Sequence, residues 1–179
     1  MAADIRPARA SDVDALLAIE NAVFPTDRLS RRSFRRLAGS PSAVLLVAEL
    51  GGRIAGYCIV LFRAGSPAAR LYSVAATPDL SGRGIGRALI EAAGQEAARR
   101  GRRSLRLEVR EDNPRAIEIY DRAGFRPTGR TPGYYQDGMA AIRLEKPLDT
   151  STNAGRGGRE TFAASGSFSR PAEKIPRRA

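Results

Sequence analysis

The residue types best suited to acid–base chemistry in this sequence are a carboxylate and a phenol, Glu108 and Tyr120. Glu108 is expected near the carboxyl end of a strand, and Tyr120 in the helix that follows. Asn113 lies between them, where it can cap that helix or bind a ligand. In an open α/β sheet, ligands gather beyond the carboxyl ends of the strands, which is where Glu108 and Asn113 are placed. Each residue also has a structural interpretation: a solvated glutamate, a plain N-cap and an aromatic ring that covers the sheet.

The composition narrows the possible chemistry further. The chain has no histidine and a single cysteine, Cys58. These counts exclude Ser-His-Asp and Cys-His catalysis, histidine metal sites and an intrachain disulfide. Cys58 stands in the apolar run 57–62 and is expected to be a small core residue. Proton transfer must therefore use Glu, Asp, Tyr, Lys or water, and no metal is expected.

A glycine-rich turn, Gly82-Arg83-Gly84-Ile85-Gly86-Arg87, separates a predicted strand from a predicted helix. Bare glycines let backbone N–H groups approach an anion, and the helix N-terminus adds partial positive charge. The turn lacks the third small residue of a dinucleotide fingerprint, because Arg87 stands there, and it lacks the Gly-Lys-Ser/Thr of a P-loop. It therefore indicates a phosphate site of another kind, or a tight turn alone.

The elements that must position these residues alternate between strands and helices. Strands are expected at residues 5–8, 44–50, 53–62, 69–76, 104–109, 125–129 and 139–145, the second and third forming a hairpin around Gly51-Gly52. Helices are expected after an N-cap at Ser11, from Ser30 to about Ala38, over 85–100, and from Pro114 to Gly124. The pattern predicts one α/β domain over residues 1–149. Residues 150–179 have no helical or strand period and are expected to be a disordered basic tail.

The net charge of +11 has two explanations. One is an anionic partner such as a nucleic acid or the ribosome. The other is an arginine-rich composition, since only Lys146 and Lys174 are lysines, and the spread of arginines over every predicted element favours it. Direct nucleic-acid binding is not expected, because aromatic residues are few and no recognition motif is present. No signal peptide is visible and no apolar run could span a bilayer, so a cytoplasmic protein without a membrane partner is expected.

Residues 71–135 resemble the GNAT superfamily of acyl-CoA N-acyltransferases. The resemblance rests on the order and spacing of Val74-Ala-Ala-Thr-Pro78, Gly82-Arg-Gly-Ile-Gly86, Asn113, Tyr120 and Gly124-Phe125. It implies an α/β fold with a mixed, mostly antiparallel central sheet of about six to seven strands flanked by about four helices.

A narrower likeness joins the chain to the ribosomal-protein alanine N-acetyltransferases, which acetylate protein N-termini. It is carried by Leu105-Arg-Leu-Glu-Val-Arg-Glu-Asp-Asn113, by Tyr134-Tyr135 and by Glu20 with Phe24-Pro25, and it covers about residues 4–147. Two residues depart from the pattern. Ser81 stands where the family usually has Gln or Arg, which weakens one phosphate contact. Ala140 stands where the subgroup commonly has an acidic residue, which puts its substrate preference in question.

The resemblance implies an acetyl-CoA-dependent N-acetyltransferase, with Glu108 as the base, acting through water, and Tyr120 as the acid. The Tyr120 phenol has a reference pKa of ~10 against ~8.5 for a thiol, a match that lets it donate to the leaving thiolate without being ionised at neutral pH. The implied acetyl-CoA contacts are Val74, Ala75, Ala76, Gly82, Arg83, Gly84, Ile85, Gly86, Arg87 and Asn113. The implied acceptor contacts are Glu20, Phe24, Tyr134 and Tyr135.

The implied acceptor is the α-amine of a protein or peptide N-terminus, with a ribosomal protein among the candidates. One alternative is the same transfer to a small-molecule amine. Others are a non-catalytic acetyl-CoA-binding module and a basic ribosome-binding module. The intact Glu108 and Tyr120 argue against a non-catalytic module, and the scarcity of aromatic residues argues against a nucleic-acid binder.

Overall fold

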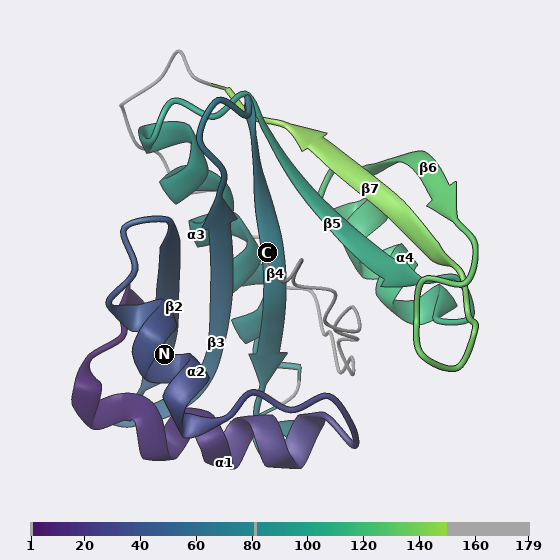
Figure 1. Ribbon diagram of the computed structural model, residues 1–179. Coiled ribbons are helices and arrows are strands. Elements are labelled where there is room, and N and C mark those ends of the chain that lie inside the picture. Colours follow the sequence, from purple (N-terminus) through teal and green to yellow (C-terminus); the bar gives the residue numbers. More distant parts are fainter. Residues whose placement is uncertain (1, 81, 150–179) are drawn as a thin grey trace.

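The computed structural model describes residues 2–80 and 82–149 (Figure 1). Ser81 and the predicted tail, 150–179, lie outside the described residues. The strands are β1 (Asp4–Pro7), β2 (Ala43–Leu50), β3 (Arg53–Phe62), β4 (Ala68–Ala76), β5 (Ser104–Arg110), β6 (Arg126–Thr131) and β7 (Ala141–Pro147). The helices are α1 (Val13–Val23), α2 (Arg31–Ala38), α3 (Ile85–Arg99) and α4 (Pro114–Arg122), with 3-10 turns η1 (Ala10–Asp12) and η2 (Pro78–Leu80).

The strands form one seven-stranded sheet in the order β1-β2-β3-β4-β5-β7-β6. Every neighbouring pair is antiparallel except β4 and β5, which are parallel. The predicted mixed, mostly antiparallel sheet is therefore confirmed. The last strand, β7, inserts between β5 and β6, and these three strands extend away from the β1–β4 half (Figure 1).

Each face of the sheet has its own hydrophobic cluster. On one face, α1 and α2 pack on the β2–β4 half, with Leu16, Phe34 and Tyr57 among the buried residues. On the other face, α3 and α4 pack against a cluster that includes Leu107 and Tyr120. Because neighbouring residues on a strand point to opposite faces, the side chain at each strand position can be assigned to one of the two clusters.

The two N-terminal helices begin differently from each other. As predicted, α2 follows Ser30, whose Oγ accepts a hydrogen bond from Ser33 N at 3.1 Å. The predicted N-cap at Ser11 is wrong, since η1 occupies that place and α1 begins at Val13. The Asp12 side chain makes no cap hydrogen bond to α1; its carboxylate instead accepts from Arg9 N at 2.7 Å within η1. A carboxylate is favoured here because it also forms an ion pair, which a serine hydroxyl could not do.

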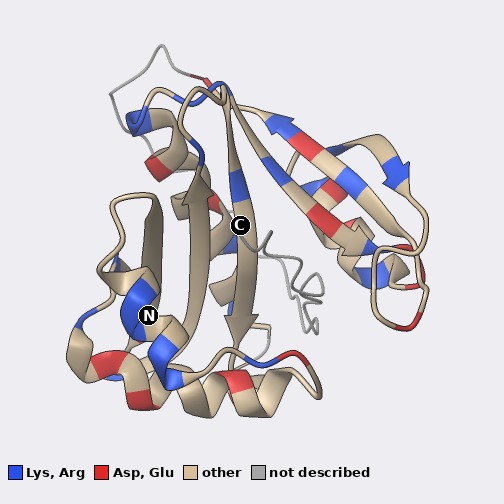
Figure 2. Ribbon diagram, in the orientation of Figure 1, with Lys and Arg blue, Asp and Glu red and all other residues tan. Residues whose placement is uncertain are grey.

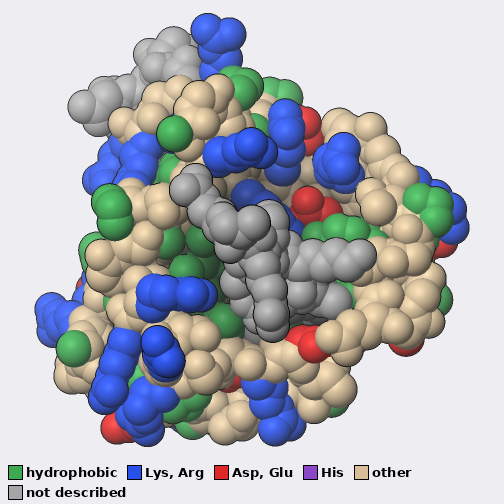
Figure 3. Space-filling view, in the orientation of Figure 1, with side chains coloured by type: hydrophobic (Ala, Val, Ile, Leu, Met, Phe, Trp, Pro, Cys, Tyr) green, Lys and Arg blue, Asp and Glu red, His purple; other side chains and the backbone are tan. Residues whose placement is uncertain are grey.

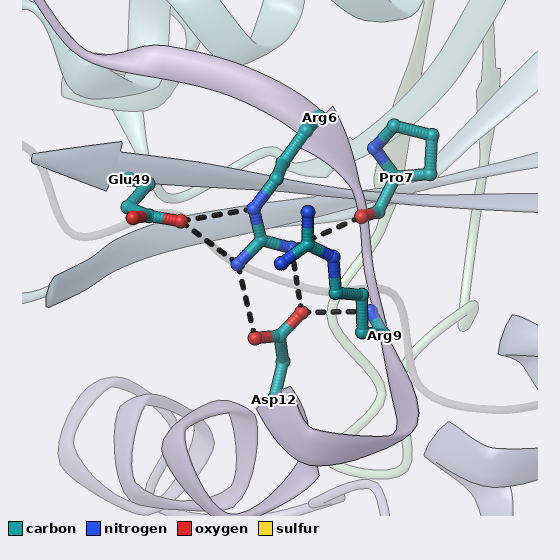
Figure 4. Close-up of polar contacts among 5 residues, drawn as sticks. All are labelled: Arg6, Pro7, Arg9, Asp12 and Glu49. Atoms are coloured by element: carbon teal, nitrogen blue, oxygen red, sulfur yellow. Dashed lines mark hydrogen bonds and ion pairs between the residues drawn. The ribbon is translucent and has the colours of Figure 1, made fainter. Parts of the chain in front are cut away.

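That ion pair ties the N-terminal strand to the rest of the fold (Figure 4). The Arg6 guanidinium donates to both Asp12 oxygens, at 2.8 and 3.1 Å, and through Nε to Glu49 Oε2 at 2.9 Å. The Arg6 and Asp12 side chains are only 16% and 9% exposed. A charge pair so largely removed from water is costly to break on one side only.

We expect Arg6→Met to lower the free energy of unfolding by roughly 2–3 kcal/mol at pH 7, because it leaves two carboxylates without their positively charged partner. The hydrogen bond from Arg6 holds the pKa of Asp12 below its usual range despite its burial. This stabilisation is present above the unfolded-state pKa of Asp and is lost as the pH falls through the lower folded-state pKa. Urea unfolding of both proteins should therefore show a difference that shrinks in acid.

The control for this variant is Arg53→Met, which breaks the exposed pair between Arg53 and Asp79. An exposed pair contributes about 0–1 kcal/mol, so this variant should change stability little. Equal losses in the two variants would contradict the role given to Arg6.

The charged residues are spread over the molecule. Acidic and basic residues alternate along β5 and β7 (Figure 2). Basic side chains occur in many separate places on the face shown in Figure 3. This distribution favours the arginine-rich composition as the explanation for most of the net charge. None of the helices within residues 2–80 and 82–149 has the length and apolar character needed to cross a membrane.

Candidate active site

The sheet divides where β4 and β5 stop pairing. Their parallel ladder covers only Ala68–Arg70 against Ser104–Arg106, although β4 continues to Ala76 and β5 to Arg110. Beyond Arg70, β4 is paired with β3 alone among the described strands. One edge of β4 therefore presents backbone groups that an extended ligand could pair with.

An irregularity in β4 lies at the start of this division. Ile59 pairs with Ser73 and Val60 with Leu71, so Tyr72 is an extra residue in the ladder with β3. A bulge bends its strand and increases the local twist. The bulge explains why β4 turns away from β5 just after their last pair.

Glu108 lies on β5 beside this division. Its neighbours Leu107 and Val109 pack in the α3–α4 cluster, so the Glu108 side chain faces the side of α1 and α2. The side chain is 16% exposed. Arg70 Nε donates to Glu108 Oε2 at 2.9 Å, and Arg70 Nη2 donates to the Tyr134 hydroxyl at 3.0 Å. The structure thus brings two predicted site residues together through an arginine that the sequence analysis did not single out.

Tyr120 lies on the opposite face of the sheet. It is 4% exposed and packs edge-on against Phe125, with the ring centroids 5.7 Å apart. Burial raises the pKa of the Tyr120 phenol, so the group stays protonated at neutral pH. Glu108 and Tyr120 therefore lie on different faces of the sheet. A ligand that lies in the division could meet a base on one side and an acid on the other.

The loop between β6 and β7 carries Tyr134 and Tyr135, as predicted. Their rings meet edge-on, 5.2 Å apart, and the Arg110 guanidinium lies 4.8 Å from the centre of the Tyr135 ring. The Tyr135 hydroxyl is buried without a hydrogen-bond partner among the residues that the structure describes. Burial raises the pKa of both phenols. Both rings are therefore neutral groups beside the predicted base.

The glycine turn leads directly into α3. Gly82 and Gly84 have left-handed φ values of 83° and 74°, and no atom lies within 4 Å of the place where either would carry a Cβ. Gly84 is the N-cap and offers no capping side chain, and the first turn of α3 holds no acidic residue. Arg83 and Arg87 are exposed beside it. This helix N-terminus has the open backbone and the positive charge that a phosphate requires.

Three other predicted contacts have structural partners. Asn113 caps α4 through Oδ1, which accepts from Ala116 N at 3.1 Å. Glu20 is fully buried and accepts from Leu29 N at 2.5 Å and from the Tyr57 hydroxyl. Phe24 is buried in the same cluster. Direct contact of Glu20 and Phe24 with an acceptor stays a prediction. Their burial favours a structural role, in which they hold the segment between α1 and α2 in place.

The other candidates for chemistry are few. Cys58 is fully buried, as predicted, and burial raises the pKa of its thiol to about 12. It is therefore a poor nucleophile at neutral pH. In the described part of the chain, carboxylates and the thiol form no cluster that could hold a metal ion.

Comparison with known proteins assigns the chain to a protein family. The sequence profile of the acetyltransferase (GNAT) family matches residues 13–125, which include the glycine turn, Glu108 and Tyr120. The chain belongs to the GNAT family of acetyltransferases. Several of its relatives are named N-acetyltransferases, and the family uses acetyl-CoA.

One relative of this GNAT protein is from Bacillus subtilis and has the provisional name ribosomal protein bS18-alanine N-acetyltransferase. It is 30% identical over 135 residues, which are 75% of this chain and 88% of the relative. The crystal structure of the ribosomal-protein-S18-alanine N-acetyltransferase from Escherichia coli superposes with a TM-score of 0.73. It is 26% identical, over 87% of this chain and 99% of that one. A mycothiol acetyltransferase of Propionibacterium freudenreichii is 28% identical, but this chain spans only 44% of its length.

Arg70 is the site residue of this GNAT acetyltransferase that sequence reasoning missed. The available signal was an arginine inside the otherwise apolar strand 68–76. Burial lowers the pKa of the Arg70 guanidinium, but the negative charge of Glu108 acts in the opposite direction, and on balance the pKa is raised. The charge is therefore permanent.

Proposed function

We propose that this acetyltransferase moves the acetyl group of acetyl-CoA directly to the α-amine of a protein or peptide N-terminus. Glu108 is the base and Tyr120 is the acid. The observation that carries the proposal is that Glu108 lies beside the division between β4 and β5 on one face of the sheet, while Tyr120 lies on the other face. An acyl donor that lies in the division would have Glu108 and the incoming amine on one side. Tyr120 and the departing thiolate would be on the other side.

In this proposal, acetyl-CoA is held along its whole length. Its pantetheine arm pairs with the unpaired edge of β4 at Val74, Ala75 and Ala76, and a backbone N–H there stabilises the oxyanion. The pyrophosphate lies on the turn from Gly82 to Arg87, and Asn113 contacts the arm. The short loop before α3 supports this placement, because it connects the end of β4 to the predicted phosphate site.

The reaction needs two proton movements. Glu108, acting through water, takes a proton from the amine, and the neutral nitrogen attacks the thioester carbon. A C–N bond forms and the C–S bond breaks, while Tyr120 gives its proton to the departing thiolate. The buried Cys58, with its raised pKa, supports direct transfer in preference to an acyl-cysteine intermediate.

The acceptor assignment draws on the relatives that are named for ribosomal-protein alanine. It also draws on the position of Tyr134, whose hydroxyl is linked to Glu108 through Arg70. From there the loop between β6 and β7 could contact a peptide backbone, with the segment between α1 and α2 as the other wall. A ribosomal protein is therefore one candidate acceptor.

We expect a peptide with a free N-terminal alanine and no lysine to be acetylated roughly 300-fold more efficiently than an N-terminally blocked peptide with one lysine. The reason is that an α-amine has a reference pKa of ~7.7–8.0 and lysine ~10.4, so much more of the α-amine is neutral at pH 7. Free-thiol release from acetyl-CoA gives kcat/KM, and mass spectrometry locates the acetyl group.

A blocked peptide without lysine sets the background for this measurement. Faster acetylation of the lysine peptide would refute the α-amine assignment. Turnover with small-molecule amines but with neither peptide would favour the alternative acceptor class, for which the mycothiol acetyltransferase relatives provide a precedent.

A further inference from the structure

Arg70 is held in place at the predicted base by two hydrogen bonds. Its Nε binds Glu108 Oε2 at 2.9 Å, its Nη2 binds the Tyr134 hydroxyl at 3.0 Å, and its guanidinium carbon lies 5.7 Å from the centre of the Tyr72 ring. A guanidinium has five N–H donors. The other three have no acceptor among the described residues, and the side chain is 35% exposed. Arg70 therefore presents fixed, unused donors beside Glu108.

We infer that Arg70 determines specificity by binding the carbonyl or carboxylate oxygen on the α-carbon of the acceptor while Glu108 takes the proton of the amine through water. This inference rests on the proposed function and deepens it. In an α-amino acyl group the carbonyl carbon is two bonds from the nitrogen. Because Arg70 and Glu108 are in contact, an amine held one water away from Glu108 can bring its own carbonyl oxygen to the guanidinium.

The same geometry selects against other amines. A lysine side chain has only methylene groups two bonds from its nitrogen, which would cover the Arg70 donors without satisfying them. An unsatisfied donor removed from water is costly, so such an acceptor is bound more weakly. A polyamine would bring a second positive charge towards Arg70. Arg143, opposite Glu108 in the ladder of β5 and β7, adds to that repulsion.

The oxygen could come from a peptide carbonyl or from the carboxylate of a free amino acid. Both present the same acceptor at the same distance from the amine. A comparison of kcat/KM for an alanine-starting peptide and for free L-alanine distinguishes these two sources. The role of Arg70 is the same in either case.

The test uses the full-length protein with Arg70→Gln and Arg70→Lys. The probes are the alanine-starting peptide and a competitive inhibitor that has lactate in place of the alanine, which keeps the carbonyl and lacks the amine. We expect Arg70→Gln to raise the KM of the peptide and the inhibition constant of the lactyl peptide by roughly tenfold to 100-fold, as for loss of a hydrogen bond to a charged group. The value of kcat should change less than about threefold, because the lost contact stabilises the bound substrate and the transition state equally.

Arg106→Gln is the matched control. Arg106 is paired with Arg70 in the ladder of β4 and β5, two residues before Glu108, and it forms its own ion pair with Glu145 at 3.2 Å. Its removal should leave both constants within about twofold of the wild type. Arg70→Lys keeps the positive charge but lacks the planar, forked set of N–H donors of a guanidinium, so it too should raise the inhibition constant. It provides the test if the Arg70→Gln protein is unstable.

A lower kcat with an unchanged inhibition constant in either stable Arg70 variant would overturn the inference, since Arg70 would then act only by positioning Glu108. A failure of the proposed function would give a different result. The wild-type protein itself would then release no thiol with the alanine-starting peptide.

Discussion

Replacing Tyr120 by phenylalanine should lower kcat by about 10²–10⁴-fold and leave the Kd for acetyl-CoA unchanged. The substitution deletes one hydroxyl from a ring that is 4% exposed and packed against Phe125, so it removes a proton donor and little volume. Stopped-flow or steady-state thiol release gives kcat, and calorimetry gives the Kd. Because burial raises the pKa of Tyr120, the wild-type enzyme should show no loss of activity from phenol ionisation up to about pH 10.

The control for Tyr120→Phe is its melting temperature, which should match that of the wild type if the ring packing is kept. A loss of kcat under about threefold, with a normal melting temperature, would show that Tyr120 only packs. The thiolate would then leave without an acid. An unchanged kcat together with an alkaline limb in the pH profile would assign the acid role to another group.

The local features of the fold could be predicted from the sequence because they depend on neighbouring residues. The hairpin between β2 and β3 follows from Gly51 and Gly52, whose φ values of 59° and 78° suit glycine. The order of the strands in the sheet is different, because it depends on contacts between distant segments. No local pattern places β7 between β5 and β6, and the mostly antiparallel arrangement was predicted through the family resemblance alone.

The error at Ser11 has a similar origin. Serine and aspartate are both good N-caps, and Ser11 and Asp12 are adjacent. Asp12 does not cap α1 through its side chain, because its carboxylate receives the Arg6 guanidinium from β1. A contact between two elements therefore determines a feature that local preference left open.

The residues of the candidate site also differ in whether the sequence alone could indicate them. Glu108, Tyr120 and the glycine turn could be proposed from their types and spacing in one half of the chain. Arg70 could not, because its partners lie 38 and 64 positions further on and meet it only when β4, β5 and the β6–β7 loop are assembled. The burial of Glu20 was likewise invisible, since a glutamate on an amphipathic helix is usually solvated.

Gly84→Asp should weaken acetyl-CoA binding by roughly 100-fold or more, because a carboxylate within a few ångströms of the pyrophosphate costs about 3 kcal/mol at an effective dielectric constant of 20. Any side chain at φ +74° is strained, but aspartate is among the residues that best tolerate the left-handed region and open space surrounds the place where its side chain would start, so the chain should still fold. Calorimetric titration with acetyl-CoA measures the change, and circular dichroism checks the fold.

The matched control is Gly84→Asn. Asparagine has nearly the shape of aspartate and the same tolerance of the left-handed region, so it introduces the same bulk and backbone strain without the charge. If the phosphates lie on this turn, the asparagine variant should lose far less affinity than the aspartate variant, and added salt should narrow the gap between them. Equal losses would mean that the turn is sensitive to bulk alone. Unchanged binding in both variants would place the phosphates away from the N-terminus of α3.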